Sequence, residues 1–470
     1  MRTYLFYDIE TSGLNHCFDQ ILQFAAIRTD DRLHPQQQYE LRIRLQPDVI
    51  PSPGALTTCR VTLEDIQAGY DEYSAMRQIH AWLNEPGTLS LGYNTLSFDD
   101  LFLRFSFYRN LLPAYTHQWK DGCARADLFP LMALYYLYRP NLFTWPTIND
   151  KVSLKLEHLA SANGLDDGQA HDAMVDVAAT VRLAQRMAQD SALWQTGFRL
   201  FDKDYDADSL AHLPTRRLGH AAYPIGVLVE GSFGARRDFR APALMLGPIE
   251  RQTKQTHWLR LDDARLQSLE PGQPGGFLVI NKKLGELPFV LALNAPEMFS
   301  AERHALIEDN LAWLASHPAI LDSLTAQHTA TVYTERPNLD PYAALYQVGF
   351  PNRREEMLAQ EFHAASWPTK ARLIPQFTGV YQELARRLVG NHAPEVLSAE
   401  EAERYQAYLA SAWRAPDAAE RVDYKGQPKL TPTAALAELT KHRAANLDDE
   451  QQQILTGLES FLRAGCASYI

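Results

Sequence analysis

Acidic side chains stand at three separated places in the N-terminal part of this 470-residue chain. The first is "LFYDIETSGLN" (residues 5–15), in which Asp8 and Glu10 are two positions apart. Side chains so spaced on a β-strand point to the same face. Two carboxylates held that close repel each other, so the pattern indicates a positive partner between them, either a metal ion or a neighbouring Arg or Lys.

The other two places lie at expected helix starts. "LGYNTLSFDDLF" puts Asp99 in the first turn of a helix that follows a strand ending at "GYN". "AHDAMVDVAAT" carries His171 five positions before Asp176. Five positions are about 140° of helical rotation, so these two share a face only if His171 sits at a frayed N-terminus. Taken singly, each fragment has an ordinary alternative. The acid pair also fits a solvated strand end, Asp99 fits a helix cap, and the spacing of His171 and Asp176 is common in proteins.

Together and in this order, the three segments resemble the motifs of the DEDDh 3′→5′ exonucleases. The likeness includes the Thr-Ser-Gly after the acid pair, the Asn before the second acid and the Ala two residues after the histidine. The resemblance implies phosphodiester hydrolysis with two divalent ions about 4 Å apart. The carboxylates of Asp8, Glu10, Asp99 and Asp176 suit Mg²⁺, with Mn²⁺ as a substitute, better than zinc. His171 would accept the proton of the attacking water.

The elements that must position these residues form an alternating pattern up to about residue 190. Three successive strands (4–10, 20–29 and 39–45) precede a helix (72–83), a strand (89–94) and a helix (98–112). Helical segments at 128–138, 153–165 and 170–190 complete an α/β domain. Short β-branched and aromatic runs follow to about 350, with a helix at 301–318, and the rest is helical.

This order of regions, first α/β, then β-rich, then helical, resembles that of the bacterial exonuclease I family, the processive exonucleases of single-stranded DNA. The resemblance implies an RNase H-like exonuclease domain (1–192), an SH3-like β-rich domain (196–350) and a helical C-terminal domain (353–470). It implies a monomer that degrades single-stranded DNA 3′→5′ to 5′-mononucleotides, in DNA repair or recombination, and binds the tail of single-stranded DNA-binding protein. The sequence does not place the pocket for that tail.

Substrate contacts follow from the same resemblance, position by position. The first domain supplies Glu10 and Thr11 beside the sugar, with Arg104, Tyr115, Trp119, Arg139 and Lys155, the last of which stands where the family has Arg and so loses bidentate phosphate contact. In the second domain, the basic concentration formed by Arg236, Arg237, Arg240, Lys282 and Lys283 is interpreted, from its charge and not from the resemblance, as one wall of a strand-binding channel. Ordinary packing remains open for Tyr115 and Trp119, and a solvated face remains open for the basic set.

Composition limits the cellular setting. The four cysteines are scattered and the chain shows neither a signal core nor a long uncharged apolar run, which indicates a cytoplasmic protein outside the membrane. A net charge of −12 is unusual for a nucleic-acid enzyme, but metal-binding acids and a concentrated basic groove can account for it.

Two other functions stay open: a nuclease for RNA or a structured 3′ end, and a non-catalytic binding scaffold, which the five retained site residues disfavour.

Overall fold

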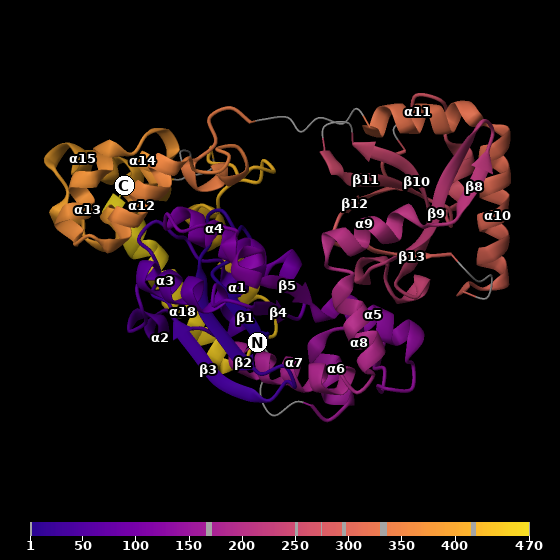
Figure 1. The fold of residues 1–470 in the computed structure, drawn as a ribbon. Helices are drawn as coiled ribbons and strands as arrows, with labels where there is room; N and C mark the ends of the chain where they lie inside the picture. The colour runs from indigo at the N-terminus through magenta and orange to yellow at the C-terminus, as the bar shows by residue number, and fades with distance from the viewer. Residues whose placement is uncertain are drawn as a thin grey trace. The chain divides into compact units, whose positions relative to one another are not determined.

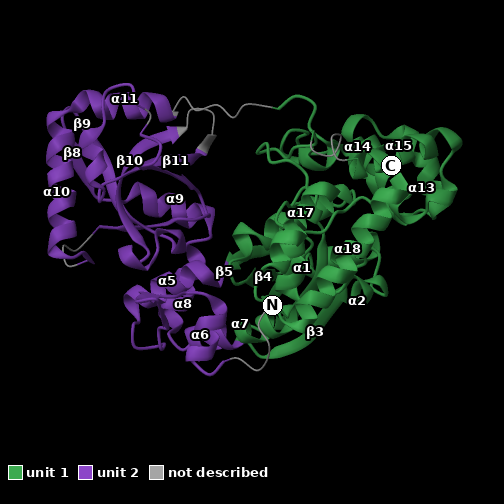
Figure 2. Ribbon diagram, turned by 180° about the vertical axis from the view of Figure 1, so that it is seen from behind, with its two compact units in different colours: residues 1–126, 166–181, 335–470 green, residues 127–165, 182–334 purple. Residues whose placement is uncertain are grey.

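The computed structural model describes residues 2–165, 172–249, 252–273, 275–293, 298–329, 336–414 and 420–469. Its helices and strands are labelled in Figure 1. The chain forms two compact units, coloured separately in Figure 2. Unit 1 comprises residues 1–126, 166–181 and 335–470, and unit 2 comprises residues 127–165 and 182–334. The two units are described separately below.

Unit 1 is built around a mixed five-stranded sheet of order β3-β2-β1-β4-β5. Its strands are β1 (Thr3–Thr11), β2 (Ile21–Thr29), β3 (Pro35–Arg42), β4 (Thr88–Gly92) and β5 (Ala124–Asp127). Strand β1 runs antiparallel to β2 and parallel to β4, and β2 runs antiparallel to β3. The three N-terminal strands and the strand at 89–94 expected from the sequence are therefore confirmed.

The helices of unit 1 come from both ends of the chain. The N-terminal ones are α1 (Pro53–Cys59), α2 (Leu63–Gln67), α3 (Glu72–Leu83) and α4 (Asp99–Arg109). The C-terminal ones are α12 (Arg353–Ala364), α13 (Trp367–Leu373), α14 (Gly379–His392), α15 (Ala399–Trp413), α17 (Pro432–Arg443) and α18 (Asp449–Tyr469). Helix α7 (Ala173–Met187) begins in unit 1 and continues into unit 2.

Strand β1 separates a hydrophobic core from an acidic face. Leu5, Tyr7 and Ile9 belong to a buried cluster with residues of β2, α3 and α4. Because side chains alternate along a strand, Asp8 and Glu10 project from the opposite face of β1. The packing that buries one side of β1 thus determines where the two carboxylates lie.

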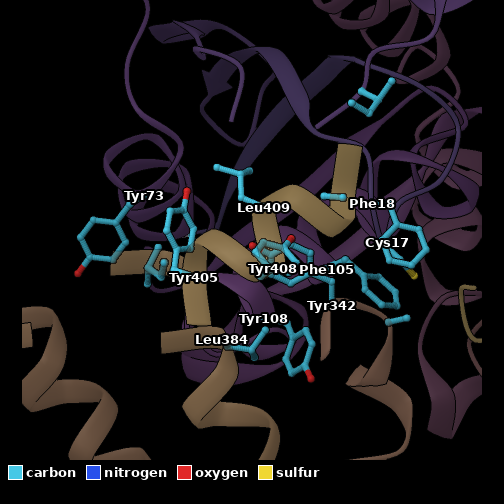
Figure 3. Packing of buried hydrophobic residues seen from close by; sticks show 14 of the residues in the cluster. Cys17, Phe18, Tyr73, Phe105, Tyr108, Tyr342, Leu384, Tyr405, Tyr408 and Leu409 are labelled. Carbon is cyan, nitrogen blue, oxygen red and sulfur yellow. The ribbon is translucent and has the colours of Figure 1, made fainter. Parts of the chain in front are cut away.

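A second core joins the N-terminal sheet region to the C-terminal helices. Figure 3 shows part of it: Phe105 and Tyr108 of α4 lie with Tyr342 and with Leu384 of α14 and Tyr408 of α15. The helical region at 353–470 therefore shares its core with the first part of the chain. The three domain boundaries expected from the sequence stay a proposal.

Unit 2 contains the β-rich region. Its main sheet has the order β12-β11-β10-β9-β13, and β8 pairs with β9. The strands are β8 (Thr215–Leu218), β9 (Ala221–Val229), β10 (Arg240–Ile249), β11 (Gln252–Arg260), β12 (Val279–Lys283) and β13 (Phe289–Ala292), with the small pair β6 (Thr147–Ile148) and β7 (Lys151–Val152) apart from them. All the recorded pairings in this unit are antiparallel.

The helices of unit 2 come before and after the strands of the main sheet in the chain. They are α5 (Leu128–Tyr138), α6 (Leu156–Ala162), α8 (Ser191–Arg199), α9 (Lys203–Ala211), α10 (Ala301–Ser316) and α11 (Pro318–Thr329). The expected helices at 128–138 and 301–318 are confirmed as α5 and α10. Within the described ranges, none of the helices combines the length and apolar character needed to cross a bilayer.

Candidate active site

Three carboxylates converge on the acidic face of β1. One oxygen each of Asp8, Glu10 and Asp176 lies within 4.8 Å of the others. Asp8 and Glu10 are two positions apart on β1, and Asp176 stands in the first turn of α7. Residues about 170 positions apart in the chain are therefore brought to one place by the packing of α7 beside β1.

Asp99 is attached to the same strand through the backbone. Its Oδ1 accepts a hydrogen bond of 3.2 Å from the amide of Ile9, the residue between Asp8 and Glu10. Asp99 is the first residue of α4, as the sequence predicts, and it is buried. Its negative charge contributes to the raised pKa of Asp8, which places the fourth acid in electrostatic contact with the cluster.

The turn between β4 and α4 explains how Asp99 approaches β1. A Cβ on Gly92 would lie 2.4 Å from the carbonyl oxygen of Tyr7 and 2.3 Å from Cγ2 of Thr95, so only glycine fits there. Asn94 follows with φ of 67°, the left-handed conformation that Asn tolerates better than most residues. The "GYN" segment is thus a close-packed turn that presents the start of α4 to β1.

Burial and mutual repulsion disfavour the ionised forms of Asp8 and Glu10. Burial, followed by the charges of Asp99, Asp176 and Asp172, raises the pKa of Asp8 well above its usual range. Burial, followed by Asp8, Asp176 and Asp172, raises the pKa of Glu10 to about 9. A divalent cation would relieve this repulsion, and a ligand set of carboxylate oxygens suits a hard ion such as Mg²⁺. The residues present therefore fit a metal site.

Asp172 adds a negative charge that the sequence analysis missed. It raises the pKa of both Asp8 and Glu10. Its Oδ1 also accepts hydrogen bonds from the amides of Met174 and Val175, at 3.0 and 3.3 Å, which caps the start of α7. The sequence signal for Asp172 is its position directly before α7, where Asp is a common helix cap. The neighbouring His171 lies outside the described residues.

Asp100, next to Asp99, has the opposite electrostatic environment. Its buried carboxylate forms ion pairs with Arg104 and Arg125 and accepts a hydrogen bond from His117 at 3.2 Å. Burial alone would raise the pKa of Asp100, but the charges of Arg125 and Arg104 and the contact with His117 hold it below its usual range. Two adjacent acids on α4 thus differ: the cluster surrounds Asp99 with negative charge, and cations neutralise Asp100.

The expected substrate contacts of unit 1 have different exposures. The Thr11 hydroxyl is buried and donates to the Gly13 carbonyl at 2.8 Å. The Arg104 guanidinium lies 5.6 Å from the ring centroid of the half-buried Tyr115. Trp119 is 67% exposed. Of these residues, Trp119 therefore presents the most accessible ring.

Among the expected contacts of unit 2, Lys282 requires a correction. It is completely buried, paired with Asp206, and its Nζ donates to the carbonyl oxygens of Lys283 and Glu286 at 2.9 and 2.6 Å. The structure therefore gives it an internal role and does not support a contact with DNA. The sequence could not show this, because the partner Asp206 comes from a different element, α9.

The other expected contacts of unit 2 are exposed or partly exposed. Lys155 is exposed and lies 3.4 Å from Glu157, and Arg139 is half-exposed in an ion pair with Asp190. Arg237 lies 4.0 Å from Asp262, and Arg240 pairs with Asp238 at 3.3 Å. The neighbouring Arg236 is exposed, and Lys283 pairs with Glu286 at 2.7 Å. Since surface ion pairs are weak, these side chains can exchange their partners for phosphates at small cost.

Comparisons with known proteins agree with this geometry. Residues 5–184 match the RNase T family model, described as an exonuclease. The chain is 39% identical over 186 residues to exodeoxyribonuclease I of Escherichia coli (strain K12), an alignment that covers 39% of each protein. The aligned region thus spans about two fifths of the length of such curated relatives. Over these residues, the resemblance to exonuclease I that the motifs indicate is confirmed.

Solved structures extend the likeness to the whole fold. The crystal structure of E. coli exonuclease I in complex with a dA16 oligonucleotide superposes with a TM-score of 0.83, at 23% identity, over 99% of this chain and 100% of that one. The structure of exonuclease I from Methylocaldum szegediense superposes with a TM-score of 0.82, at 24% identity, over 99% of this chain and 100% of that one. The expected fold class is therefore confirmed: an α/β exonuclease domain, a β-rich region and a C-terminal helical region.

Proposed function

We propose that this chain is a processive 3′→5′ exonuclease that degrades single-stranded DNA to 5′-mononucleotides. The observation that carries the proposal is the convergence of Asp8, Glu10 and Asp176, with Asp99 bonded to the backbone between the first two. The match of residues 5–184 to an exonuclease family supports the reaction class. Similar structures determined with oligonucleotides support single-stranded DNA as the substrate.

The acid cluster would hold two divalent ions, Mg²⁺ in the physiological enzyme, with Mn²⁺ as a substitute. Bound ions would supply charge neutralisation at the phosphate and activation of the attacking water. Asp8, Glu10 and Asp176 provide converging oxygens, and Asp99 completes the set from α4. His171 accepts the proton of the attacking water. Ionised carboxylates in a partly buried site have high affinity for such ions because each ion removes the repulsion between them.

The remaining contacts of the substrate belong to the same proposal. Glu10 and Thr11 border the terminal nucleotide, and Arg104, Tyr115 and Trp119 follow along unit 1. For unit 2, taken by itself, phosphate contacts are proposed for Lys155, Arg139, Arg236, Arg237, Arg240 and Lys283. Rings stack on bases of any identity and cations contact phosphates, so this set gives affinity without sequence preference.

The cellular setting is proposed on the same basis. The enzyme acts in the cytoplasm as a monomer, in DNA repair or recombination, and binds the tail of single-stranded DNA-binding protein. Size-exclusion chromatography with light scattering tests the oligomeric state, and titration with the tail peptide tests the partner. A dimer mass, or no change of fluorescence anisotropy with a labelled peptide, would contradict the respective statement.

Digestion of 5′-labelled substrates tests the activity. With Mg²⁺, single-stranded DNA should give a ladder that shortens from the 3′ end, while EDTA should stop the reaction and duplex DNA and RNA should be degraded far more slowly. Faster hydrolysis of RNA would favour the RNA nuclease, and DNA binding with no hydrolysis in Mg²⁺ or Mn²⁺ would favour the scaffold.

Processivity should be tested on the full chain. Phe105 and Tyr108 of α4 share a core with the C-terminal helices, so removing everything beyond about residue 195 would expose that core. In a trap challenge, enzyme bound to labelled DNA receives excess unlabelled DNA together with Mg²⁺. A processive enzyme continues to short products, whereas arrest after the first few nucleotides would refute processivity.

A further inference from the structure

The loop of residues 12–20 joins β1 to β2 and begins two positions after Glu10; we name it the β1–β2 loop. Hydrogen bonds close its two ends. The Ser12 amide donates to the Gln20 carbonyl oxygen at 2.8 Å, and the Gln20 amide donates to the Ser12 hydroxyl at 2.9 Å. The end of β1 that carries Glu10 is therefore continuous with a closed loop.

Asp19 is a buried acid inside this loop. It is 6% exposed. Its Oδ2 accepts a hydrogen bond of 2.8 Å from the Asn15 amide, and its Oδ1 accepts one of 3.4 Å from the Ser12 hydroxyl. Burial raises the pKa of Asp19 to about 6, and the hydrogen bond from the Asn15 amide acts against this rise. The carboxylate thus connects the start, the middle and the end of the loop.

Gly13 packs directly against the Asp19 carboxylate. A Cβ on Gly13 would lie 2.3 Å from Oδ2 of Asp19 and 2.6 Å from its Cγ, which is closer than non-bonded atoms approach. Gly13 does not have the positive φ that favours glycine, so the contact with Asp19 is what requires a residue without a side chain here. The glycine of the "TSG" segment therefore makes room for Asp19.

The pairing of β1 with β2 is irregular where Glu10 stands. In the ladder, Glu10 pairs with Gln23. The next residue, Thr11, pairs with Ile21, so β2 carries one extra residue at this point. Such a bulge changes the direction of neighbouring side chains and is common beside active sites. Because regular pairing ends at the bulge, the orientation of Glu10 depends on how the β1–β2 loop closes.

Contacts with distant segments of unit 1 give the loop a fixed frame. Nη1 of Arg109, at the end of α4, donates to the Asp19 carbonyl oxygen at 2.8 Å. Cys17 and Phe18 belong to the core that the N-terminal region shares with the C-terminal helices (Figure 3). The backbone of Asp19 is thus anchored, so its carboxylate can hold the more exposed part of the loop in place.

We propose that Asp19 is a positioning residue of the acid cluster, an inference that rests on the proposed function. Its carboxylate keeps the β1–β2 loop closed, and the closed loop keeps Glu10 turned toward Asp8 and Asp176. Asp19 is not one of the three converging acids, so it acts through the backbone of β1. Groups that orient metal ligands in this way typically contribute about 10- to 100-fold to metal affinity or activity.

Removing the carboxylate tests the proposal. Asp19→Ala is compared with Asp19→Asn, which keeps the size of the side chain and one acceptor oxygen. Mn²⁺ binding is measured by electron paramagnetic resonance, which needs no turnover, together with kcat on dT20 in Mg²⁺ and the Kd for dT20 in Ca²⁺. For Asp19→Ala we expect Mn²⁺ affinity and kcat to fall about 10-fold or more, while the Kd for dT20 stays near the wild-type value. Asp19→Asn should recover most of both losses.

A glycine substitution disturbs the same carboxylate from the other side. The new methyl group of Gly13→Ala meets Oδ2 of Asp19 at 2.3 Å, so this variant should reproduce the losses of Asp19→Ala, and it replaces that variant if Asp19→Ala does not fold. Gly390→Ala is the matched control, because its methyl group meets the Tyr405 ring at 2.3 Å in the C-terminal part of unit 1. The control should lose Tm but keep Mn²⁺ affinity and kcat, measured below its Tm.

The outcomes separate this inference from the proposed function. Wild-type Mn²⁺ affinity and kcat in Asp19→Ala would overturn the positioning role. Equal losses in Gly13→Ala and Gly390→Ala would overturn it as well, because stability alone would then account for them. If the wild-type protein hydrolyses no oligonucleotide, the proposed function fails, and the Mn²⁺ affinities of the variants still decide the role of Asp19.

Discussion

The raised pKa of Glu10 makes the stability of the metal-free protein depend on pH. The folded protein holds the Glu10 proton up to a pKa of about 9, while an unfolded chain releases it near 4.5. Between these values the folded state binds more protons, so the free energy of unfolding falls as pH rises. One such group contributes about 1.4 kcal/mol per pH unit, hence about 2 to 3 kcal/mol between pH 6 and pH 8.

Glu10→Gln removes this dependence while keeping the shape of the side chain. In EDTA, the Tm of the wild type should fall from pH 6 to pH 8 by roughly 3 °C more than that of the variant, because the unfolding entropy of a 470-residue chain corresponds to about 1 °C per kcal/mol. At pH 8 the inactive variant should be the more stable protein. Adding Mg²⁺ should reverse the order, because the ion stabilises the ionised wild-type cluster.

Differential scanning fluorimetry at several pH values, with EDTA or Mg²⁺, measures these differences. Glu64→Gln, which alters an exposed glutamate on α2, is the matched control and should follow the wild type. If Glu10→Gln kept the full pH dependence of the wild type in EDTA, the raised pKa assigned to Glu10 in the buried acid cluster would be refuted.

Three further predictions concern the site and its support. Asp176→Ala should abolish turnover while binding of DNA in Ca²⁺ persists, and full activity by gel assay would remove this residue from the metal ligands. His171→Ala should lower kcat by roughly 10² to 10⁴ and flatten its pH profile, so an unchanged profile would contradict a general base. Gly92→Ala should reduce both Tm and activity, because the new methyl group meets the Tyr7 carbonyl at 2.4 Å and Thr95 at 2.3 Å; a variant with wild-type Tm would show that the turn can relax.

Much of unit 1 could be read from local patterns. The alternation in β1 predicts that Asp8 and Glu10 share a face, and the structure places them together. The position of Asp99 in the first turn of a helix is confirmed as well. Strand β10 has a less regular pattern, since Pro242 and the irregular pairing around Gly247 obscure the period of two that identifies a strand.

Such local patterns do not predict which residues of different elements contact each other in the folded chain. Lys282 and Lys283 are adjacent lysines of one strand, yet Lys282 is buried on Asp206 and Lys283 pairs with Glu286 at the surface. Asp99 and Asp100 are adjacent acids, of which the motif resemblance singles out Asp99, but only the folded chain shows that Arg125 and His117 contact Asp100. The different electrostatic environments of these two acids therefore depend on residues from other elements.

The sequence by itself determined the acid set, its order, the strand and helices that carry it, and the reaction class these imply. Local side-chain periodicity identifies the strand and the helices, because burial of one face of a strand or helix requires it. The acid set and the reaction class follow from the resemblance of the three segments to the DEDDh exonucleases. Only the tertiary structure decided which cations pair with Asp100, and that Tyr346 and Tyr424 lie against Phe105 of α4. Contacts between segments more than two hundred residues apart arise from packing of complementary surfaces, which no local pattern encodes.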